Sequence, residues 1–223
     1  MVMKHMTNDA TTIDETTGTV ELVDGEDVSL LSADSLKNLA QLEDPCAYAT
    51  CNLLVGNEEY SPLFEVKGRA RFYVEKPLIA AVTGKGSAEV VSDGESIKVE
   101  LWKAIPIPPK SYLIVKGPKA YVSFSKLKAN GRGKIKPKSL FKVSVLNGGI
   151  PKDIIARYLP LSFFDEIRRI RQSADDRIKN VMHTVNKIKR HLQLSCEAAA
   201  RGAKLVRVNV QGIPMDVWIE EIR

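Results

Sequence analysis

The sequence predicts a mainly β protein with some α-helix: a β-barrel, then a long amphipathic helix and a C-terminal β-hairpin. Between residues 63 and 145, short β-rich runs alternate with Gly, Pro, Lys and Asp, which is typical of a barrel or sandwich rather than of βαβ units. After Pro151, apolar residues recur at helical spacing as far as Ala199. The 223 residues, 44% of them hydrophobic, are enough to bury a core.

The first sixty residues predict a tail, a strand and two helices. Residues 1–18 are rich in Thr and Asp and lack a hydrophobic period, so we expect a flexible tail. The fold is expected to begin near Thr19 with a short strand, which a turn at 24–25 ends. A short helix follows over 35–42, and a second helix over 44–57 has Pro at its first position and Gly near its end.

Short strands with glycine and proline turns are predicted for the middle of the chain. Turns are expected at the Asp-Gly pair 93–94 and the Gly-Pro pair 117–118. The segment T-G-K-G-S at 83–87 superficially resembles a phosphate loop, but Ile79 stands where such a loop needs Gly. We therefore expect a strand followed by a glycine turn there. The predicted strands are 63–66, 71–74, 78–83, 88–91, 97–102, 111–115, 120–124 and 141–145.

A long helix is predicted for 161–201, because Ala174, Ile178, Val181 and the apolar residues after them alternate at spacings of four and three. About 40 residues would span ~60 Å. These apolar residues form a seam along one side of the helix. The seam could pack on the barrel or pair with a second copy through 163–201, or the helix could fold back at a break. Two strands joined at 211–212 then form a terminal hairpin, which needs a sheet edge from the barrel or from a partner copy.

The net charge of +6 conceals an asymmetry along the chain. Residues 1–66 hold 13 acidic and two basic residues, a balance of −11, whereas residues 101–152 hold twelve basic and no acidic residues, a balance of +12. The basic segment could bind an anionic partner, or the acidic and basic segments could face each other within one fold. Tyr112, Tyr121 and Phe124 interleave with the basic stretch and could stack bases, so nucleic-acid binding is a hypothesis that ranks below those given next.

Cysteine usage and the N-terminus indicate a cytoplasmic protein without a membrane span. The three cysteines form no C-x-x-C pair, which is typical of reduced thiols, and Cys46 and Cys51 are expected to be small packing residues. No signal-peptide run and no stretch of 18 apolar residues occurs. The three histidines are dispersed, so no metal site is expected.

Two further features keep alternatives open. Trp102 ends a strand-like run and is either a core anchor or an aromatic wall of a ligand pocket. The segment G-R-G-K at 131–134 could grip phosphate or form an ordinary turn between strands.

One stretch carries a specific pattern. Residues 44–57 read D-P-x-A-x-x-x-x-N-x-L-V-G-N, and Phe64-Glu65, the Ala-Val-Thr-Gly at 81–84, Trp102 and the Ala-Tyr-Val at 120–122 follow in order. This resembles the first half of the family of the C-type component of 5-oxoprolinase, which includes the carboxyltransferase domain of urea amidolyase, also called allophanate hydrolase subunit 2. The resemblance covers residues 44–145 and implies a cyclophilin-like β-barrel. The chain then divides into a tail over 1–18, a cyclophilin-like carboxyltransferase-type domain over 19–148, and a helix with terminal strands over 149–223.

The chain departs from the family after this first half. The family's opening T-T-x-Q-D-x-G-R is absent, and the helical segment stands where a second barrel would follow. The segment from Gly202 through Gly212 to Trp218 resembles a strand pair of the family and is either a remnant of that second half or a chance similarity.

The resemblance implies a reduced form of this C-type component, acting in an ATP-dependent 5-oxoprolinase, amide-hydrolase or carboxyltransferase system. Its partners would be a protein similar to the B-type component of 5-oxoprolinase, a second copy, or both, and its substrate a small amide or carboxylate. Whether the chain is itself an enzyme stays open, leaning towards a hydrolase component with an incomplete site. A non-enzymatic assembly or regulatory module with the same fold is the alternative. No directly bound cofactor is expected, although ATP could act at the level of the complex.

Six polar positions in the matching stretch are candidates for the pocket lining, while no catalytic residue is identified. Asn and Thr side chains would orient an amide and Lys85 would hold a carboxylate. Each of these residues could instead be a turn or cap residue. The candidates are Asn52, Asn57, Glu65, Thr83, Gly84 and Lys85.

Overall fold

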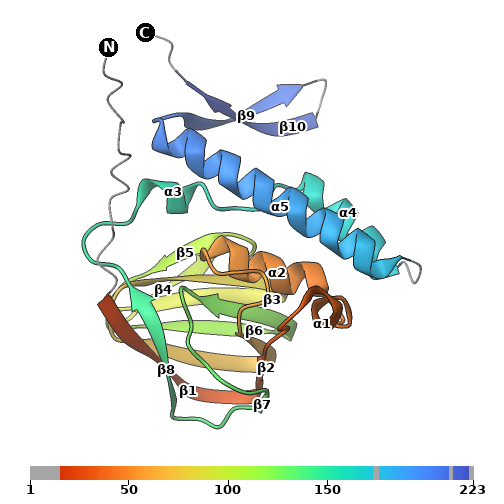
Figure 1. Cartoon of the computed structure of the whole chain (residues 1–223). Coiled ribbons are helices and arrows are strands. Elements are labelled where there is room, and N and C mark those ends of the chain that lie inside the picture. Colours follow the sequence, from red (N-terminus) through yellow and green to blue (C-terminus); the bar gives the residue numbers. More distant parts are fainter. Residues whose placement is uncertain (1–15, 173–175, 211–212, 221–223) are drawn as a thin grey trace, which may run out of the picture.

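The computed structural model describes residues 16–172, 176–210 and 213–220, and it confirms the predicted fold class (Figure 1). A barrel-like sheet is followed by helices and a separate hairpin. The strands are β1 Thr16–Leu31, β2 Leu63–Val74, β3 Leu78–Ser92, β4 Glu95–Val99, β5 Ala104–Ile107, β6 Ser111–Phe124, β7 Gly133–Lys134, β8 Ser139–Val145, β9 Lys204–Val210 and β10 Ile213–Ile219. The helices are α1 Leu36–Ala40, α2 Pro45–Leu54, α3 Lys152–Ile155, α4 Ser162–Gln172 and α5 Arg177–Ala200.

The large sheet is antiparallel and curls around an apolar core. Its strand order is β4-β3-β6-β2-β1-β7, with β5 on β3 and β8 on β1. The two ends approach each other, since the Leu146 N–H donates to the Pro77 carbonyl at 2.8 Å beside the start of β3. Phe64, Phe72 and Phe124 are fully buried inside and contact one another through their rings.

Three pairs of predicted short strands are single long strands, because the sheet bends at glycines instead of turning. The turns expected at 83–87 and 117–118 are wrong, and β3 and β6 continue through both. A side chain on Gly86 would collide with the Lys116 carbonyl, and one on Gly117 with the Lys85 carbonyl. Neighbouring strands therefore cross closely at their bends, which lets the sheet close into a barrel.

The first strand is also longer than predicted. It begins at Thr16 and passes through the expected turn at 24–25, which is wrong, with shifts of register on both sides of that pair. Residues 1–15 of the expected tail lie outside the described residues. The turn at Asp93 and Gly94 is confirmed, since both residues have positive φ, 51° and 82°. Trp102 lies outside a strand, and the sequence did not predict β5.

Both predicted N-terminal helices are present and capped. The Ser35 hydroxyl accepts from the Asn38 N–H at the start of α1, and the Asp44 carboxylate accepts from the Ala47 N–H at the start of α2. Helix α2 lies on the outer face of β3 and β6, where the Cys51 thiol contacts two strand carbonyls at 3.3 Å. Burial raises the pKa of this thiol to about 12, in keeping with a packing role.

The single helix predicted over 161–201 is wrong, because the structure has two helices that fold back on each other. The Thr184 hydroxyl of α5 donates to Glu166 Oε1 of α4 at 2.7 Å. In one continuous helix these residues would stand ~27 Å apart. Residues 173–175, between α4 and α5 in the sequence, lie outside the described residues, and Asp176 before α5 has a left-handed backbone with φ 52°.

The apolar seam of α5 packs on its own domain. Val181, Val185, Ile188 and Leu192 are buried in one cluster with the side chains of α2. Figure 1 shows the resulting layers: barrel, then α2, then α5 with α4 beside it, then the hairpin. Of the three alternatives for the seam, packing on the domain and folding back both occur, while pairing with a second copy stays a prediction.

The predicted terminal hairpin is confirmed and forms a two-stranded sheet of its own. Among the residues that the structure describes, neither barrel edge joins it, so the barrel alternative for this edge is wrong, while an edge from a partner copy stays a prediction. The Trp218 indole N–H donates to the Ser195 hydroxyl of α5 at 3.3 Å, and Arg201 pairs with Glu220 at 2.7 Å. The pair 211–212 lies outside the described residues.

Residues of the acidic N-terminal segment and of the basic segment 101–152 meet within the fold. Strand β1 pairs with β7 and β8, which places Asp27 at 3.3 Å from Lys134. Arg132 lies 3.1 Å from Asp34. Part of the charge asymmetry is therefore satisfied inside the molecule. No helix in the described residues combines the length and the apolar character of a membrane span.

Candidate functional site

A cavity of about 460 Å³ opens where β2, β3 and β6 bend beside the start of α2. Glu43 and Asp44 come from the segment before α2, and the bends of the three strands supply the rest. We call it the lysine cavity, because its polar lining is dominated by three lysines. Its lining residues are Glu43, Asp44, Lys67, Gly84, Lys85, Pro118, Lys119 and Tyr121.

Lys119 sits between two carboxylates at this cavity. Its Nζ pairs with Glu43 and lies 3.2 Å from Glu65 Oε2, while Lys67 lies 3.0 Å from the other oxygen of Glu65. Lys119 is largely buried, with 17% of its side chain exposed, as is Glu65 with 12%. The two lysines and two glutamates thus form one connected salt-bridge network.

The ionisation of the network follows from these contacts. Burial alone would lower the pKa of Lys119, but its bonds to Glu43 and Glu65 outweigh burial and raise it. The same hydrogen bond from Lys119 lowers the pKa of Glu43. Burial raises the pKa of Tyr121. At neutral pH the lysine, the glutamate and the tyrosine thus keep their usual charge states, and none of the three is tuned for proton transfer.

The outer part of the cavity carries positive charge that faces solvent. Lys85 is exposed, and half of the Lys67 side chain is exposed. Gly84 next to Lys85 has φ 90°, and a side chain there would press on the Lys119 carbonyl at 2.6 Å. Such an arrangement suits the recognition of a small anion by charge-assisted hydrogen bonds.

Three of the six predicted site residues come together at this place. Gly84 and Lys85 line the lysine cavity, and Glu65 is joined to it through Lys119 and Lys67. Their role in binding stays a prediction. The signal that marked them was the matching stretch of sequence, since charge alone does not separate Lys85 from the other lysines of the chain.

The other three predicted site residues make hydrogen bonds within the fold. The fully buried Asn52 amide donates to the Ser61 carbonyl at 2.7 Å, and the Thr83 hydroxyl donates to the Ala47 carbonyl at 2.7 Å. Asn57 donates to the Phe124 carbonyl at 2.9 Å and lines another cavity, beside α5. None of the three lines the lysine cavity.

Glu43, Lys67 and Lys119 were not predicted as site residues from the sequence. They are separated by up to 76 positions and belong to different elements. No short motif joins them, so only the register of β2 against β6, which places Glu65 opposite Tyr121, brings them together.

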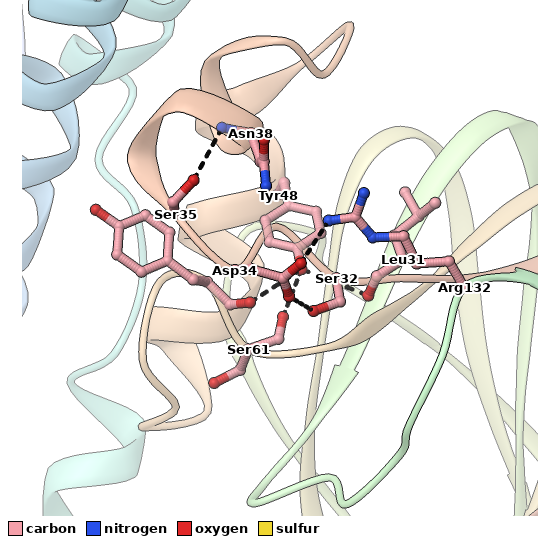
Figure 2. A network of polar contacts seen from close by, with 9 residues as sticks. Leu31, Ser32, Asp34, Ser35, Asn38, Tyr48, Ser61 and Arg132 are labelled. Carbon is pink, nitrogen blue, oxygen red and sulfur yellow. Dashed lines mark hydrogen bonds and ion pairs between the residues drawn. The ribbon is translucent and has the colours of Figure 1, made fainter.

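A second polar network, around Tyr48, serves the fold (Figure 2). The Tyr48 hydroxyl donates to the Ser61 carbonyl at 2.6 Å, and Asp34 accepts from Ser32 and from Arg132. Arg132, a candidate for gripping phosphate, is thus held by a carboxylate of the N-terminal segment. Within the described ranges, no group of three His, Cys, Asp or Glu side chains is placed to hold a metal ion.

Comparison with known proteins finds similar structures at low sequence identity. No protein-family model and no curated protein matches the sequence. The structure of TTHA0988 is similar over 64% of this chain and 33% of that chain, with 18% identity and a TM-score of 0.49. Kluyveromyces lactis urea carboxylase is similar over 64% of this chain and 16% of its own, with 16% identity and a TM-score of 0.46. K. lactis urea amidolyase is similar over 64% of this chain and 10% of its own, with 17% identity and a TM-score of 0.45. This chain thus spans less than two thirds of the length of each.

Proposed function

We propose that the chain is the substrate-binding component of a system that acts on a small amide or carboxylate, and that it holds this substrate in the lysine cavity. The observation that carries the proposal is the convergence of Lys67, Lys85 and Lys119 on one cavity. Cavities of a few hundred Å³ with a few convergent polar groups are the usual form of small-molecule sites.

The charges of the cavity favour a carboxylate. Glu43 and Glu65 already compensate Lys119, which makes it a fixed part of the cavity wall. Lys85 stands at the exposed side, where a carboxylate would gain a charge-assisted hydrogen bond without burying its charge unpaired. Lys67, whose Nζ lies 3.0 Å from Glu65 Oε1, would be shared between Glu65 and the ligand. The Lys85 role predicted from the sequence is retained in this proposal.

The chemistry would be completed by a partner. A hydrolytic or carboxyl-transfer step needs a group whose pKa lies near the working pH, and Lys119, Glu43 and Tyr121 all have pKa values shifted away from neutrality. We infer the role of a C-type component in a 5-oxoprolinase, amide-hydrolase or carboxyltransferase complex. A protein similar to the B-type component, or a second copy, would supply the reacting groups. ATP would be used by the complex.

The same observation favours the second candidate, a non-enzymatic assembly or regulatory module. In that case the lysine cavity would bind a carboxylate of a partner or a metabolite without turnover. The two candidates share the binding step and differ in the reaction.

Calorimetric titration with 5-oxoproline tests the binding step. Lys85→Met and Lys67→Met should each weaken binding about tenfold, the loss expected for one charge-assisted hydrogen bond. Lys98→Met is the matched control, because Lys98 is exposed on β4 and does not line the cavity. Equal weakening in all three variants, or no saturable binding by the parent chain, would refute the carboxylate site.

The reaction is tested on a mixture of the chain with a protein similar to the B-type component. 5-Oxoproline-dependent ATP hydrolysis that needs both chains and falls with Lys85→Met would support the enzymatic role. A stable complex without turnover would support the regulatory module.

A further inference from the structure

A second and larger cavity, of about 640 Å³, lies between the barrel, α4 and the terminal hairpin. Four separate parts of the chain build it: the connection from β4 to β5, the connection from α3 to α4, helix α4 itself, and both strands of the hairpin. It shares no residue with the lysine cavity. We call it the aromatic cavity. Its lining residues are Glu100, Leu101, Trp102, Lys103, Tyr158, Leu159, Pro160, Leu161, Phe164, Leu205, Arg207 and Asp216.

The inner wall is held in place by backbone hydrogen bonds. The Leu159 N–H donates to the Trp102 carbonyl at 2.9 Å, and the Ala104 N–H donates to the Arg157 carbonyl at 2.8 Å. The Trp102 ring meets the Phe164 ring edge-on, with 5.1 Å between centroids. The aromatic wall is thus formed by the fold itself and does not depend on the hairpin.

Trp102 adopts a backbone conformation that bulky residues avoid. Its φ is 64°, and its N–H donates to the Val82 carbonyl at 2.8 Å. A non-glycine residue with a large side chain rarely occupies this region, and such strain persists only where the surroundings enforce it. Here the strain places the indole in the wall of a cavity.

The hairpin and the segment before α4 add apolar side chains to the lining that solvent reaches. Leu205 of β9 is 40% exposed, and Leu161, from the segment before α4, is 74% exposed. Single exposed leucines are common. Two that line the same cavity as Trp102 and Phe164 give it an apolar slot with open access.

The charged groups of the aromatic cavity compensate one another. Arg207 Nε lies 2.8 Å from Asp216 Oδ1, and the Tyr158 hydroxyl also donates to Asp216. Lys103 lies 3.3 Å from Glu100. The two cations and two anions of the lining leave no net charge, so a charged ligand would lose hydration without gaining an ion pair.

We propose that the aromatic cavity binds an uncharged aromatic compound, with its ring against Trp102 and Phe164 and a hydrogen-bonding group towards Tyr158, Arg207 and Asp216. The volume lies within the range of small-molecule sites and accommodates a bicyclic ring. This function is independent of carboxylate binding in the lysine cavity.

Nuclear magnetic resonance on the full ¹⁵N-labelled chain tests the proposal with three probes of similar shape: neutral indole-3-acetamide, anionic indole-3-acetate and cationic tryptamine. The indole N–H resonance of Trp102 should shift saturably with the amide. The two charged probes should bind about tenfold more weakly, because the cavity compensates neither charge. The Trp218 resonance is the comparison, because Trp218 does not line the cavity but pairs with Leu205, which does, so it should shift less than that of Trp102.

Variants localise the binding. Leu161→Glu and Leu205→Glu place a charge at the slot and should each weaken amide binding at least about fivefold. Leu194→Glu is the control, because Leu194 is 54% exposed on α5 and lies outside the lining. Leu161→Glu serves as the second readout if Leu205→Glu disturbs the hairpin. Parallel unsaturable shifts of both tryptophans, equal affinity for the three probes, or unchanged affinity in Leu161→Glu would overturn the proposal.

Discussion

Lys119 Nζ of β6 lies 3.2 Å from Glu65 Oε2 of the neighbouring strand β2. The pair sits at the bend of both strands, where little of either side chain is exposed. It therefore holds the lysine cavity together and contributes to the stability of the sheet.

Removing Lys119 should destabilise the fold more than removing a comparable lysine. Lys119→Met leaves Glu65 with Lys67 alone, and we expect the free energy of unfolding to fall by about 2 kcal/mol. Lys116→Met is the control, because 53% of that side chain is exposed and its pair with Glu89 is solvated, so its effect should be much smaller. Urea denaturation of both variants measures the difference, and equal losses would contradict this interpretation.

Substitution by valine should lower the free energy of unfolding at one of two buried threonines and not at the other. The Thr83 hydroxyl donates to the Ala47 carbonyl, so Thr83→Val should lower the free energy of unfolding by about 1 kcal/mol. The buried Thr50 hydroxyl has no hydrogen-bond partner among the described residues, so Thr50→Val should be neutral or stabilising. Thermal and urea unfolding measure both. A loss in Thr50→Val as large as that in Thr83→Val would show that the Thr83 bond is not what matters.

The stability of the protein should fall in mild acid because of His191. Burial lowers the pKa of this imidazole, and its Nε2 has no hydrogen-bond partner within the described part of the chain. The unfolded chain therefore takes up a proton near pH ~6.5, before the folded chain does. The His191 contribution is complete above that pH and is lost as the pH falls towards the folded-state pKa.

His191→Phe, which keeps an aromatic ring beside Tyr158 and Phe163, should flatten this part of the pH dependence. His183→Gln should leave it unchanged, since His183 is exposed. Urea midpoints between pH 5 and pH 8 provide the measurement. An identical slope in the parent chain and His191→Phe would rule out His191 as the origin.

The seam of α5 should contribute to the stability of the single chain. Ile188 is fully buried against α2, so Ile188→Ala should cost about 2–5 kcal/mol. Ile178→Ala, at a position that is 48% exposed, should cost far less. The loss should be independent of protein concentration. A loss that shrinks as the protein is concentrated would instead indicate that two copies share the seam.

Much of the local structure was predictable. The start of α1 at Ser35, the proline at the start of α2 and the Asp-Gly turn at 93–94 depend on a few neighbouring residues, and all three predictions are confirmed. The short β-rich runs and the helical spacing after Pro151 also predicted a barrel or sandwich followed by a helix and a hairpin, and the family resemblance implied the barrel. The helix start, the proline and the turn depend on contacts between neighbours in the chain.

The predicted turns failed where glycine serves long-range packing. Gly86 and Gly117 are needed because the backbones of β3 and β6 approach each other there, not because the chain reverses. In the sequence a glycine between two apolar runs looks the same in both cases. The prediction of one long helix was wrong for a similar reason, since the hydrogen bond between Thr184 and Glu166 forms only once α4 folds onto α5.

The fold class and three of the residues around the lysine cavity, Glu65, Gly84 and Lys85, could be predicted from the amino-acid order alone. The folded chain was needed to show that Asn52, Asn57 and Thr83 are bonded within the fold and that Glu43, Lys67 and Lys119 complete the cavity. The aromatic cavity, too, exists only after the terminal hairpin reaches the barrel side. The difference comes from distance along the chain: propensities and caps act over a few residues, whereas a site joins side chains that strand register and helix packing bring together.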